Sequence, residues 1–351
     1  MRRVFITVHL KNIILLITAF IAFIVITSVL IVGVGNNKSI NKNINKSKNS
    51  AIKAEDNENI IKYSSLPKIT KVKVFMSKEN TIKEINLEEY VTGVVSAEMP
   101  ASFEIEALKS QAVAARTYAL AHVKEMGGTP CKNGNGADLC DTVHCQVYRV
   151  KEERIKSWGT SGEKNWDKIK MAVGDTSGQV LTYNNALVME PYYFSTSSGK
   201  TENSEEVFSN SIPYLRSVES PGEETVKNAK SSKIVKYKDL SQIINSNYNN
   251  AKVTSANIKN RIKIIDRTEG GSVKNIKVGN ITMLGSKFRT MLGLKSSNFE
   301  MKFNSSNIEI DCSGYGHGVG MSQSGADAMA KEGRSYIEIL THYYQGTVIS
   351  K

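Results

Sequence analysis

The amino-acid sequence predicts an α+β fold that follows one N-terminal transmembrane helix. The chain has 351 residues, of which 40% are hydrophobic and 23% charged, an ordinary composition for a globular protein. Segments with the periodicity of strands and of helices both occur, but they do not alternate regularly, as they would in a parallel α/β sheet. Residues 13–32 contain no charged side chain, which is enough length for one helix to cross a membrane.

The N-terminal region is expected to hold a short cytoplasmic tail at 1–12 and a membrane anchor at 13–34. A signal peptide is the alternative, but its apolar region is usually shorter, and no clear cleavage site follows Val32. Basic residues flank the apolar segment on both sides, so the positive-inside rule does not decide the orientation. The short leader favours an extracytoplasmic position for the rest of the chain.

Residues 35–67 are rich in Asn, Lys and Ser and have no sustained apolar period, so we expect a flexible tether. The net charge of the chain is +12. The lysines of the tether would lie on anionic lipid or on an anionic wall polymer, or would serve solubility alone. A single folded domain is expected at 68–351.

The folded domain is predicted to begin with a hairpin. Residues 69–76 alternate between polar and apolar, and 81–85 follow a turn-like segment as the partner strand. Asn86 is a good N-cap for the helix that comes next. That helix is expected to end at Met99, because a proline pushes the residue before it out of the helical region.

A second helix is predicted at 104–124, where small residues repeat at helical spacing. Residues 127–148 form a loop that holds three of the four cysteines. Residues 225–262 have the character of a helical, variable insertion. The remaining strands and helices are expected at 180–183, 187–194, 273–278, 299–310, 322–331 and 335–344.

Glu98 is the leading candidate for catalysis. Tyr90, Val94 and Glu98 are spaced four residues apart, so a carboxylate shares one helix face with core-type side chains. Apolar surroundings make a carboxylate hard to ionise, which raises its pKa toward the range of a general acid. The alternative is a structural glutamate at a helix end, bonded to a neighbouring arginine or backbone amide.

A second candidate site is the cluster of Cys131, Cys140, His144 and Cys145, which lie within 15 positions. Three thiolates and one imidazole make a complete tetrahedral zinc set. A disulfide from Cys131 to Cys140 or Cys145 is the alternative outside the cytoplasm, although it leaves one of the three cysteines unpaired. Free thiols are the third possibility. Any metal here is expected to be structural.

Two long blocks of the sequence are specific enough to identify a family. The first runs from Gly93 to Leu120 and includes Ser-Ala-Glu-Met-Pro at 96–100. The second, from Gly314 to Ala326, reads Gly-Tyr-Gly-His-Gly-Val-Gly-Met-Ser-Gln-Ser-Gly-Ala. Shorter segments of the same character lie at 193–202, 213–218, 288–296 and 339–347. Together they resemble the stage II sporulation protein D family over most of residues 70–349.

The resemblance implies a membrane-anchored peptidoglycan lytic transglycosylase that acts in forespore engulfment, on the mother-cell side. Such enzymes cut the β-1,4 bond between N-acetylmuramic acid and N-acetylglucosamine in strands stripped of stem peptides, and leave a 1,6-anhydro end. The partners implied are stage II sporulation protein P, an amidase, and stage II sporulation protein M, a membrane protein. We expect two lobes around a glycan-binding groove, and no nucleic-acid partner.

The family's catalytic glutamate matches Glu98. Most glycosidases need two carboxylates, whereas a lytic transglycosylase can use one, because the 6-hydroxyl of the sugar is the internal nucleophile. We therefore expect Glu98 to act first as an acid and then as a base. The cysteine cluster is not a general mark of the family, whose usual Ser-Gln-Val-Tyr is Cys-Gln-Val-Tyr at 145–148 here.

The other similar blocks supply candidates for sugar binding. Arg116 would hold the lactyl carboxylate or orient Glu98, with a structural salt bridge as the alternative. Tyr193 and Tyr315 offer flat faces for stacking on a pyranose ring. The remaining candidates are polar residues that would bond sugar hydroxyls or line the groove: Gln146, Tyr148, Ser198, Thr201, Glu202, His317 and Gln323.

Two further functions are compatible with the sequence. A non-catalytic peptidoglycan-binding module would retain the fold and stimulate a partner amidase. A metal-dependent hydrolase would use the cysteine cluster for chemistry, so that a chelator would stop the reaction without loosening the fold. The glutamate in its full motif favours the transglycosylase over both.

Overall fold

The computed structural model describes residues 63–223, 226 and 229–351 of the chain. These residues form both helices and strands, as the α+β prediction requires. Within this part of the chain, no helix is long and apolar enough to cross a membrane. The expected cytoplasmic tail, the expected anchor and most of the expected tether lie outside the described residues.

Two hydrophobic cores organise the described residues. The first is built from residues before position 220 together with the C-terminal end of the chain. The helices of this region are α2 (Leu87–Glu98), α3 (Ile105–Leu120), α4 (Lys151–Trp158), α5 (Gly162–Asp175), α6 (Ser204–Phe208), α9 (Gln323–Lys331) and α10 (Tyr336–Tyr343). Its strands are β1 (Lys71–Met76), β2 (Thr81–Asn86), β3 (Leu139–Cys140), β4 (Val180–Tyr183), β5 (Ala186–Leu187), β6 (Tyr193–Phe194), β13 (Met321–Ser322) and β14 (Val348–Ser350).

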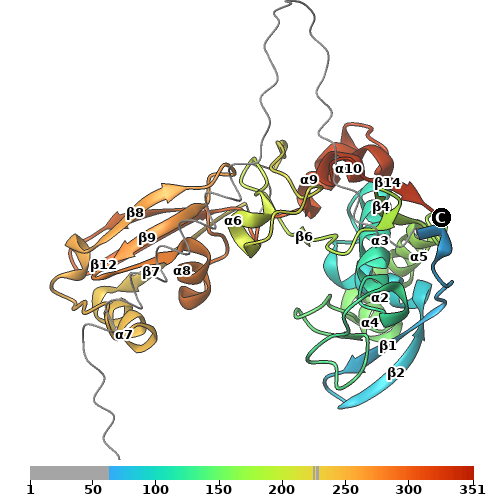
Figure 1. Ribbon diagram of the computed structural model, residues 1–351, viewed down its shortest axis with the longest axis horizontal. Coiled ribbons are helices and arrows are strands. Elements are labelled where there is room, and N and C mark those ends of the chain that lie inside the picture. The colour runs from blue at the N-terminus through green and yellow to red at the C-terminus, as the bar shows by residue number, and fades with distance from the viewer. Residues whose placement is uncertain (1–62, 224–225, 227–228) are drawn as a thin grey trace, which may run out of the picture. The chain divides into compact units, whose positions relative to one another are not determined.

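Helix α3 is the central element of the first core (Figure 1). It contacts α2, α5, α9, α10 and β4. Its alanines at 107, 112, 114, 115 and 119 are fully buried, and small side chains let neighbouring helices approach closely. The helix ends at Leu120 rather than at the expected Lys124, which instead begins a single 3-10 turn, Lys124–Met126.

Short strands bring distant segments of the first core together. Strand β3 pairs in parallel with β1, and this pairing sets Cys140 opposite Phe75. Strand β6 pairs in parallel with β13, and sets Tyr193 opposite Met321. The strand expected at 187–194 is instead split into β5 and β6, because Pro191 between them has no N–H to give to a ladder.

The second core lies within residues 235–312 and has two antiparallel three-stranded sheets, ordered β10-β9-β8 and β11-β12-β7. Helix α7 contacts β7, and α8 contacts β9 and β10 (Figure 1). The bounds of its elements are β7 (Lys230–Lys236), α7 (Tyr237–Asn247), β8 (Ile262–Arg267), β9 (Val273–Val278), β10 (Ile281–Leu284), α8 (Gly285–Leu292), β11 (Phe299–Phe303) and β12 (Asn307–Ser313).

Two expectations about this region are corrected. The segment 225–262 is not purely helical, since it contains β7 and forms only the first part of a larger unit with its own core. The strand expected at 299–310 is a hairpin of two strands, β11 and β12. In both places, a turn separates elements that the sequence pattern shows as one segment. Only the pairing of the strands shows where that turn lies.

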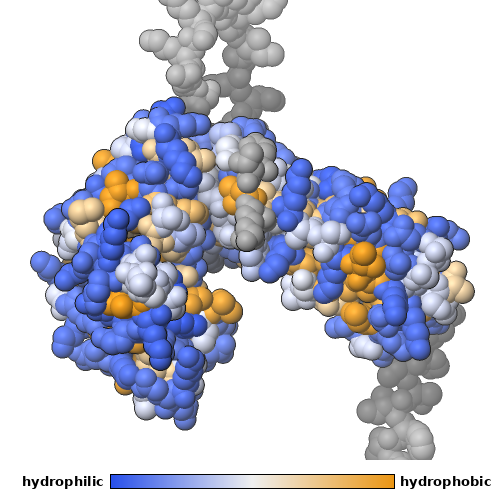
Figure 2. Space-filling view, turned by 180° about the vertical axis from the view of Figure 1, so that it is seen from behind, coloured by the Kyte–Doolittle hydropathy of each residue, from blue (hydrophilic) through white to orange (hydrophobic). Residues whose placement is uncertain are grey.

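Tyr63 lies before the expected start of the domain at residue 68 and already has partners in the fold. The backbone N–H of Tyr63 donates to Asn185 O at 2.7 Å. Tyr63 and Leu66 also pack against the first core. On the face drawn in Figure 2, hydrophilic residues cover most of the surface and the hydrophobic ones form small separate groups.

Candidate functional site

Glu98 is the last residue of α2, and the helix places it as the sequence predicts. Asn86 caps the start of α2 by accepting a hydrogen bond from Glu88 N at 3.0 Å. Tyr90 and Val94, on the same helix face as Glu98, are fully buried. Glu98 itself is only partly buried, and its Oε1 accepts a hydrogen bond from the backbone N–H of Val147 at 2.7 Å.

The surroundings of Glu98 favour its protonated form. Burial is the largest effect and raises the pKa of the Glu98 carboxyl, while hydrogen bonds from Val147 N–H and the Gln323 side chain pull that pKa down. The carboxylate also lies at the C-terminal end of α2, where the helix dipole disfavours negative charge. The structural alternative for Glu98 expected a bond from a backbone amide, and Val147 N–H provides one. The pKa of Glu98 is nevertheless raised overall, as a general acid needs.

Three polar side chains link the segment after the cysteine loop to the region of Glu98. Tyr193 donates from its hydroxyl to Gln146 Oε1 at 2.8 Å. Gln146 Nε2 in turn donates to Tyr90 Oη and to Ala115 O, each at 3.3 Å. Because Gln146 is 1% exposed and its amide is occupied in this way, it positions Val147 rather than presenting a surface for sugar.

Gln323 is the candidate that the structure brings to Glu98 from the glycine-rich block. It is the first residue of α9, and the polar group of its side chain is one of the causes that lower the pKa of the Glu98 carboxyl. Its Nε2 also donates to Gln111 Oε1 of α3 at 3.3 Å. Gln111 was not among the expected site residues, although the sequence holds a signal: it is a polar residue at i+3 on the buried stripe that Leu108 begins.

Tyr148 does not offer a free face for a sugar. Its ring is 4% exposed and stacks on Tyr90, with the ring centroids 5.4 Å apart. The ring also occupies the space where a Cβ at Gly93 would lie, so a glycine is required at that point of α2. Tyr148 therefore packs the 146–149 segment against α2.

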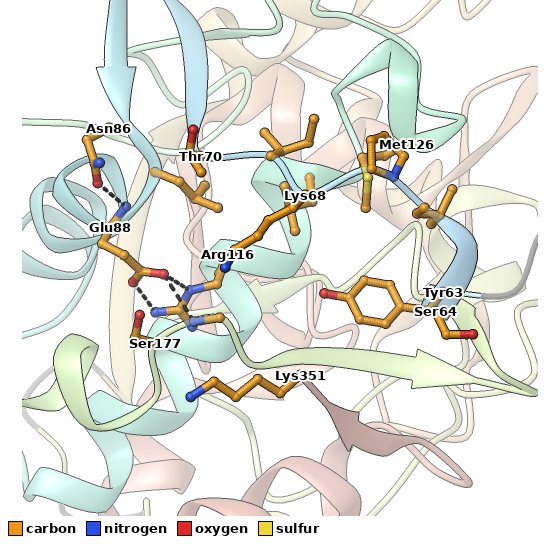
Figure 3. A pocket seen from close by; sticks show the side chains of 16 residues that line it. Tyr63, Ser64, Lys68, Thr70, Asn86, Glu88, Arg116, Met126, Ser177 and Lys351 are labelled. Atoms are coloured by element: carbon orange, nitrogen blue, oxygen red, sulfur yellow. Dashed lines mark hydrogen bonds and ion pairs between the residues drawn. The ribbon is translucent and has the colours of Figure 1, made fainter.

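Arg116 is not brought to Glu98. It is fully buried, and its guanidinium donates to Glu88 Oε1 at 2.9 Å and to Glu88 Oε2 at 2.6 Å (Figure 3). Glu88 is at the opposite end of α2 from Glu98, about 15 Å away at the helical rise of 1.5 Å per residue. The structure thus shows the structural salt bridge that was the alternative role for Arg116. A separate cavity of 480 Å³, lined partly by Lys68 and Lys351, lies beside this pair.

Ser198, Glu202 and His317 lie together, in a hollow of about 10 Å³. That volume suits a single water molecule rather than a sugar ring. Burial raises the pKa of Glu202, whose Oε1 accepts from Ser272 N at 3.3 Å and whose Oε2 has no hydrogen-bond partner among the described residues. Burial and the charge of Arg289 lower the pKa of His317 to about 4, so its ring is neutral at neutral pH.

Two other candidates have structural partners. Thr201 is fully buried, and its hydroxyl oxygen accepts from Val218 N at 2.9 Å. Tyr315 is partly exposed, but Lys295 Nζ lies over its ring at 4.3 Å from the centroid. A sugar would have to use the other face of that ring.

The cysteine cluster is assembled by the fold. The four ligand atoms of Cys131, Cys140, His144 and Cys145 all lie within 4.8 Å of one another. The described residues contain no disulfide between these cysteines, and His144 Nδ1 is 3.3 Å from Cys131 Sγ. Zinc bonds of about 2.0–2.3 Å place tetrahedral ligand atoms roughly 3.4–3.8 Å apart, so a small contraction of this cluster would hold a metal ion.

The comparisons with known proteins agree on one family. A family model described as "Stage II sporulation protein" matches residues 76–183. The chain is 40% identical over 280 residues to stage II sporulation protein D of Bacillus subtilis (strain 168), covering 80% of this chain and 79% of that protein. The protein of the same name from Bacillus amyloliquefaciens is 39% identical over 280 residues, covering 80% and 78%. An amidase enhancer of Bacillus subtilis (strain 168) is 34% identical over 309 residues, covering 74% of this chain and 40% of that protein.

Proposed function

The chain belongs to the stage II sporulation protein D family, and we propose that it is a peptidoglycan lytic transglycosylase with Glu98 as its catalytic residue. The substrate would be the glycan strand stripped of stem peptides, cut at the β-1,4 bond that follows N-acetylmuramic acid. The observation that carries the proposal is a partly buried carboxyl with a raised pKa, at the point where α2, the 146–149 segment and the start of α9 meet.

One carboxyl is sufficient for this chemistry. Glu98 in its acid form donates a proton to the glycosidic oxygen as the bond from that oxygen to C1 breaks. The carboxylate left behind accepts the proton of the sugar's 6-hydroxyl as that oxygen bonds to C1. Glu98 returns to its acid form, and no water is consumed. Among the described residues, no second carboxylate contributes to the pKa shift of Glu98, as a closely spaced catalytic pair would.

The hydrogen bonds to Glu98 serve both halves of the cycle. Burial keeps the carboxyl protonated for the first step. Once the proton has left, Val147 N–H and the Gln323 amide stabilise the carboxylate until the second step. A carboxyl without these donors would be a weaker acid, and its ionised form would be too costly to appear in turnover.

The cysteine cluster would hold a structural zinc ion in this proposal. Cys145 directly precedes Gln146 and Val147, so a bound metal would fix the backbone that carries the Val147 N–H. Three thiolates and one imidazole fill a tetrahedral zinc site, which leaves no open position for chemistry. The metal would thus support the position of Glu98 without touching the substrate.

The cellular setting is proposed from the family. The apolar segment at 13–34 would anchor the protein in the mother-cell membrane, with the folded domain outside the cytoplasm. Stage II sporulation proteins P and M would be its partners in engulfment.

Product analysis tests the proposal. Denuded glycan strands are digested with the wild-type protein and with Glu98→Gln, and the products are weighed by mass spectrometry. Disaccharides with 1,6-anhydro ends are expected from the wild type, and a loss of about 10²–10⁴-fold in rate from the variant. Hydrated ends, or undiminished cleavage by Glu98→Gln, would contradict the assignment.

A second candidate function is supported by the amidase enhancer of Bacillus subtilis, which is 34% identical to this chain. A non-catalytic protein of this kind would bind glycan and stimulate an amidase. Glu98→Gln would then release no fewer products than the wild type when an amidase is added. The same digestion, run with and without an amidase, separates the two functions.

A further inference from the structure

The cavity beside the Arg116–Glu88 pair has the size of a ligand site. Its volume is 480 Å³, within the range of about 300–1,000 Å³ that is usual for such sites. It lies at the N-terminal end of α2, whereas Glu98 is the last residue of that helix. The cavity is therefore separate from the candidate catalytic site, and the proposed cleavage gives it no role.

Much of the cavity wall is apolar. The apolar side chains come from the segment before β1, from α2, from the end of α3 and from the 3-10 turn that follows: Leu66, Ile69, Leu87, Leu120 and Met126. Three of them, Leu87, Leu120 and Met126, belong to the first core, so packing fixes this part of the wall. An apolar side chain of a ligand would be removed from water here, which favours binding.

The charges of the lining are unbalanced. Among the described residues that line the cavity, Glu88 is the only acidic one. Its carboxylate is occupied, because it accepts from Arg116 at 2.9 and 2.6 Å and from Gly178 N at 3.2 Å. Lys68 and Lys351 form no salt bridge with any described residue. Three cationic side chains and one carboxylate leave the lining with a net charge of +2.

The two lysines approach the cavity from different parts of the chain. Lys68 lies in the segment before β1, and Lys351 follows β14. Figure 3 shows them on two sides of the Arg116–Glu88 pair. A lysine ammonium has three N–H donors and no acceptor, so each one is a partner for a carboxylate. The arrangement suits a ligand that carries an apolar group with a carboxylate on each side of it.

The segment that carries Lys68 can also bond a peptide backbone. The N–H groups of Lys68, Ile69 and Thr70 donate no hydrogen bond to another described residue, although β1 begins directly after them. A peptide lying along this segment would supply acceptors for these groups, as in recognition by strand addition. A peptide therefore matches the site better than an inorganic anion, which has neither a backbone nor an apolar group.

We propose that this cavity binds an acidic peptide segment of a partner protein. One apolar side chain of the segment enters the cavity, and the carboxylates before and after it pair with Lys68 and Lys351. The site is about 15 Å from Glu98 at the helical rise of 1.5 Å per residue, so it can be occupied while a glycan is cleaved. It gives the first core a protein-binding site that does not depend on the proposed cleavage.

Binding is tested on the full chain with the peptide acetyl-Glu-Leu-Glu-amide as the probe. The methyl NMR signal of Met126, which lines the cavity, should shift and saturate, while that of Met283 in the second core should not. Lys68→Gln and Lys351→Gln should each weaken binding by about two- to fivefold. Lys277→Gln, an exposed lysine of β9 outside the cavity, is the matched control and should change nothing.

Two altered peptides separate the contributions of charge and apolar contact. Acetyl-Gln-Leu-Gln-amide and acetyl-Glu-Gly-Glu-amide should each bind at least about fivefold more weakly than the probe. The absence of a saturable Met126 shift with the probe, or equal binding of the uncharged peptide, would overturn the proposal. So would inorganic phosphate that binds as tightly as the probe, since the site would then be a general anion site.

The chain's own acidic residues are the competing occupant. Glu55, Asp56 and Glu58 precede Tyr63, the first described residue. In a variant with Glu55→Gln, Asp56→Asn and Glu58→Gln together, the affinity for the probe should stay the same. A gain of about fivefold or more would show that this segment competes for the cavity, and would overturn the assignment to a partner protein.

Discussion

The backbone N–H of Val147 donates to Glu98 Oε1 at 2.7 Å, across 49 positions of sequence. The bond joins the end of α2 to the segment that leaves the cysteine cluster. A backbone donor is held by the fold and has no rotamers of its own, so it fixes one oxygen of the carboxyl. The geometry of the loop at 131–145 therefore bears directly on the candidate catalytic group.

The pH dependence of cleavage should reveal a glutamate with a raised pKa. Bond breaking needs the protonated carboxyl, so kcat/KM should fall about tenfold per pH unit above the pKa of Glu98 in the folded protein. Burial raises that pKa above its usual value, so the limb should lie at higher pH than an ordinary glutamate would give. A limb at about 4.3, the value of an exposed glutamate, would contradict the assigned environment.

Glu98→Gln should stabilise the protein at neutral pH. The folded state binds the Glu98 proton more tightly than the unfolded state, so its ionisation costs stability as pH rises between the two pKa values. Above that window the cost is complete, and the variant should be more stable than the wild type at pH 7. Denaturant unfolding at pH 7 and below pH 4 tests this, because the gain should vanish at the lower pH.

Arg116→Met should destabilise the fold without altering the pH profile of cleavage. The Arg116 guanidinium is fully buried, and its removal leaves Glu88 without an ion-pair partner. The Glu88 side chain is one-third exposed. A loss of about 2–4 kcal/mol is expected, less than for a fully buried pair. Arg216→Met is the control, since the Arg216–Glu205 pair lies near the surface and should cost about 1 kcal/mol or less. Equal losses in the two variants would refute this ranking.

Gly93→Ala should cost stability because the segment that carries Val147 lies against α2. A Cβ at Gly93 would meet the Tyr148 ring and Arg149 O. The expected loss is about 1–3 kcal/mol, with reduced cleavage because Val147 must shift away from Glu98. Gly174→Ala in α5 is the matched control: its Cβ would meet no atom within 4 Å, so stability should rise by about 0.5–1 kcal/mol.

Removal of metal should weaken the fold and the reaction together. Cys140→Ser, or treatment with a chelator, should lower the thermal midpoint and reduce cleavage, because the loop that positions Val147 is released. Zinc content by mass spectrometry should be near one ion per chain in the wild type and low in the variant. Cys312→Ser, outside the cluster, should keep the metal. Lost cleavage with an unchanged midpoint would favour a metal-dependent hydrolase instead.

Local patterns predicted the helix that carries Glu98 and the family to which the chain belongs. The bounds of α2, its Asn86 cap and its buried stripe are properties of thirteen consecutive residues, 86–98, and local pattern is sufficient to find them. The strand β9 and the helices α9 and α10 were found for the same reason. The second core was missed as a unit, because one of its two sheets depends on the pairing of β7 with β12, whose partner residues lie 71 to 83 positions apart.

The sequence alone was enough to single out Glu98 and to group Cys131, Cys140, His144 and Cys145, because both signals lie within short stretches of chain. Only the tertiary structure decided which groups stand around Glu98. It turned Arg116 toward Glu88, buried Tyr148 against Gly93, and brought Gln323 and Gln111 together from positions 212 apart. The physical reason is that a hydrogen bond depends on separation in space within a few ångströms, and spacing along the chain sets that separation only inside a single helix or strand.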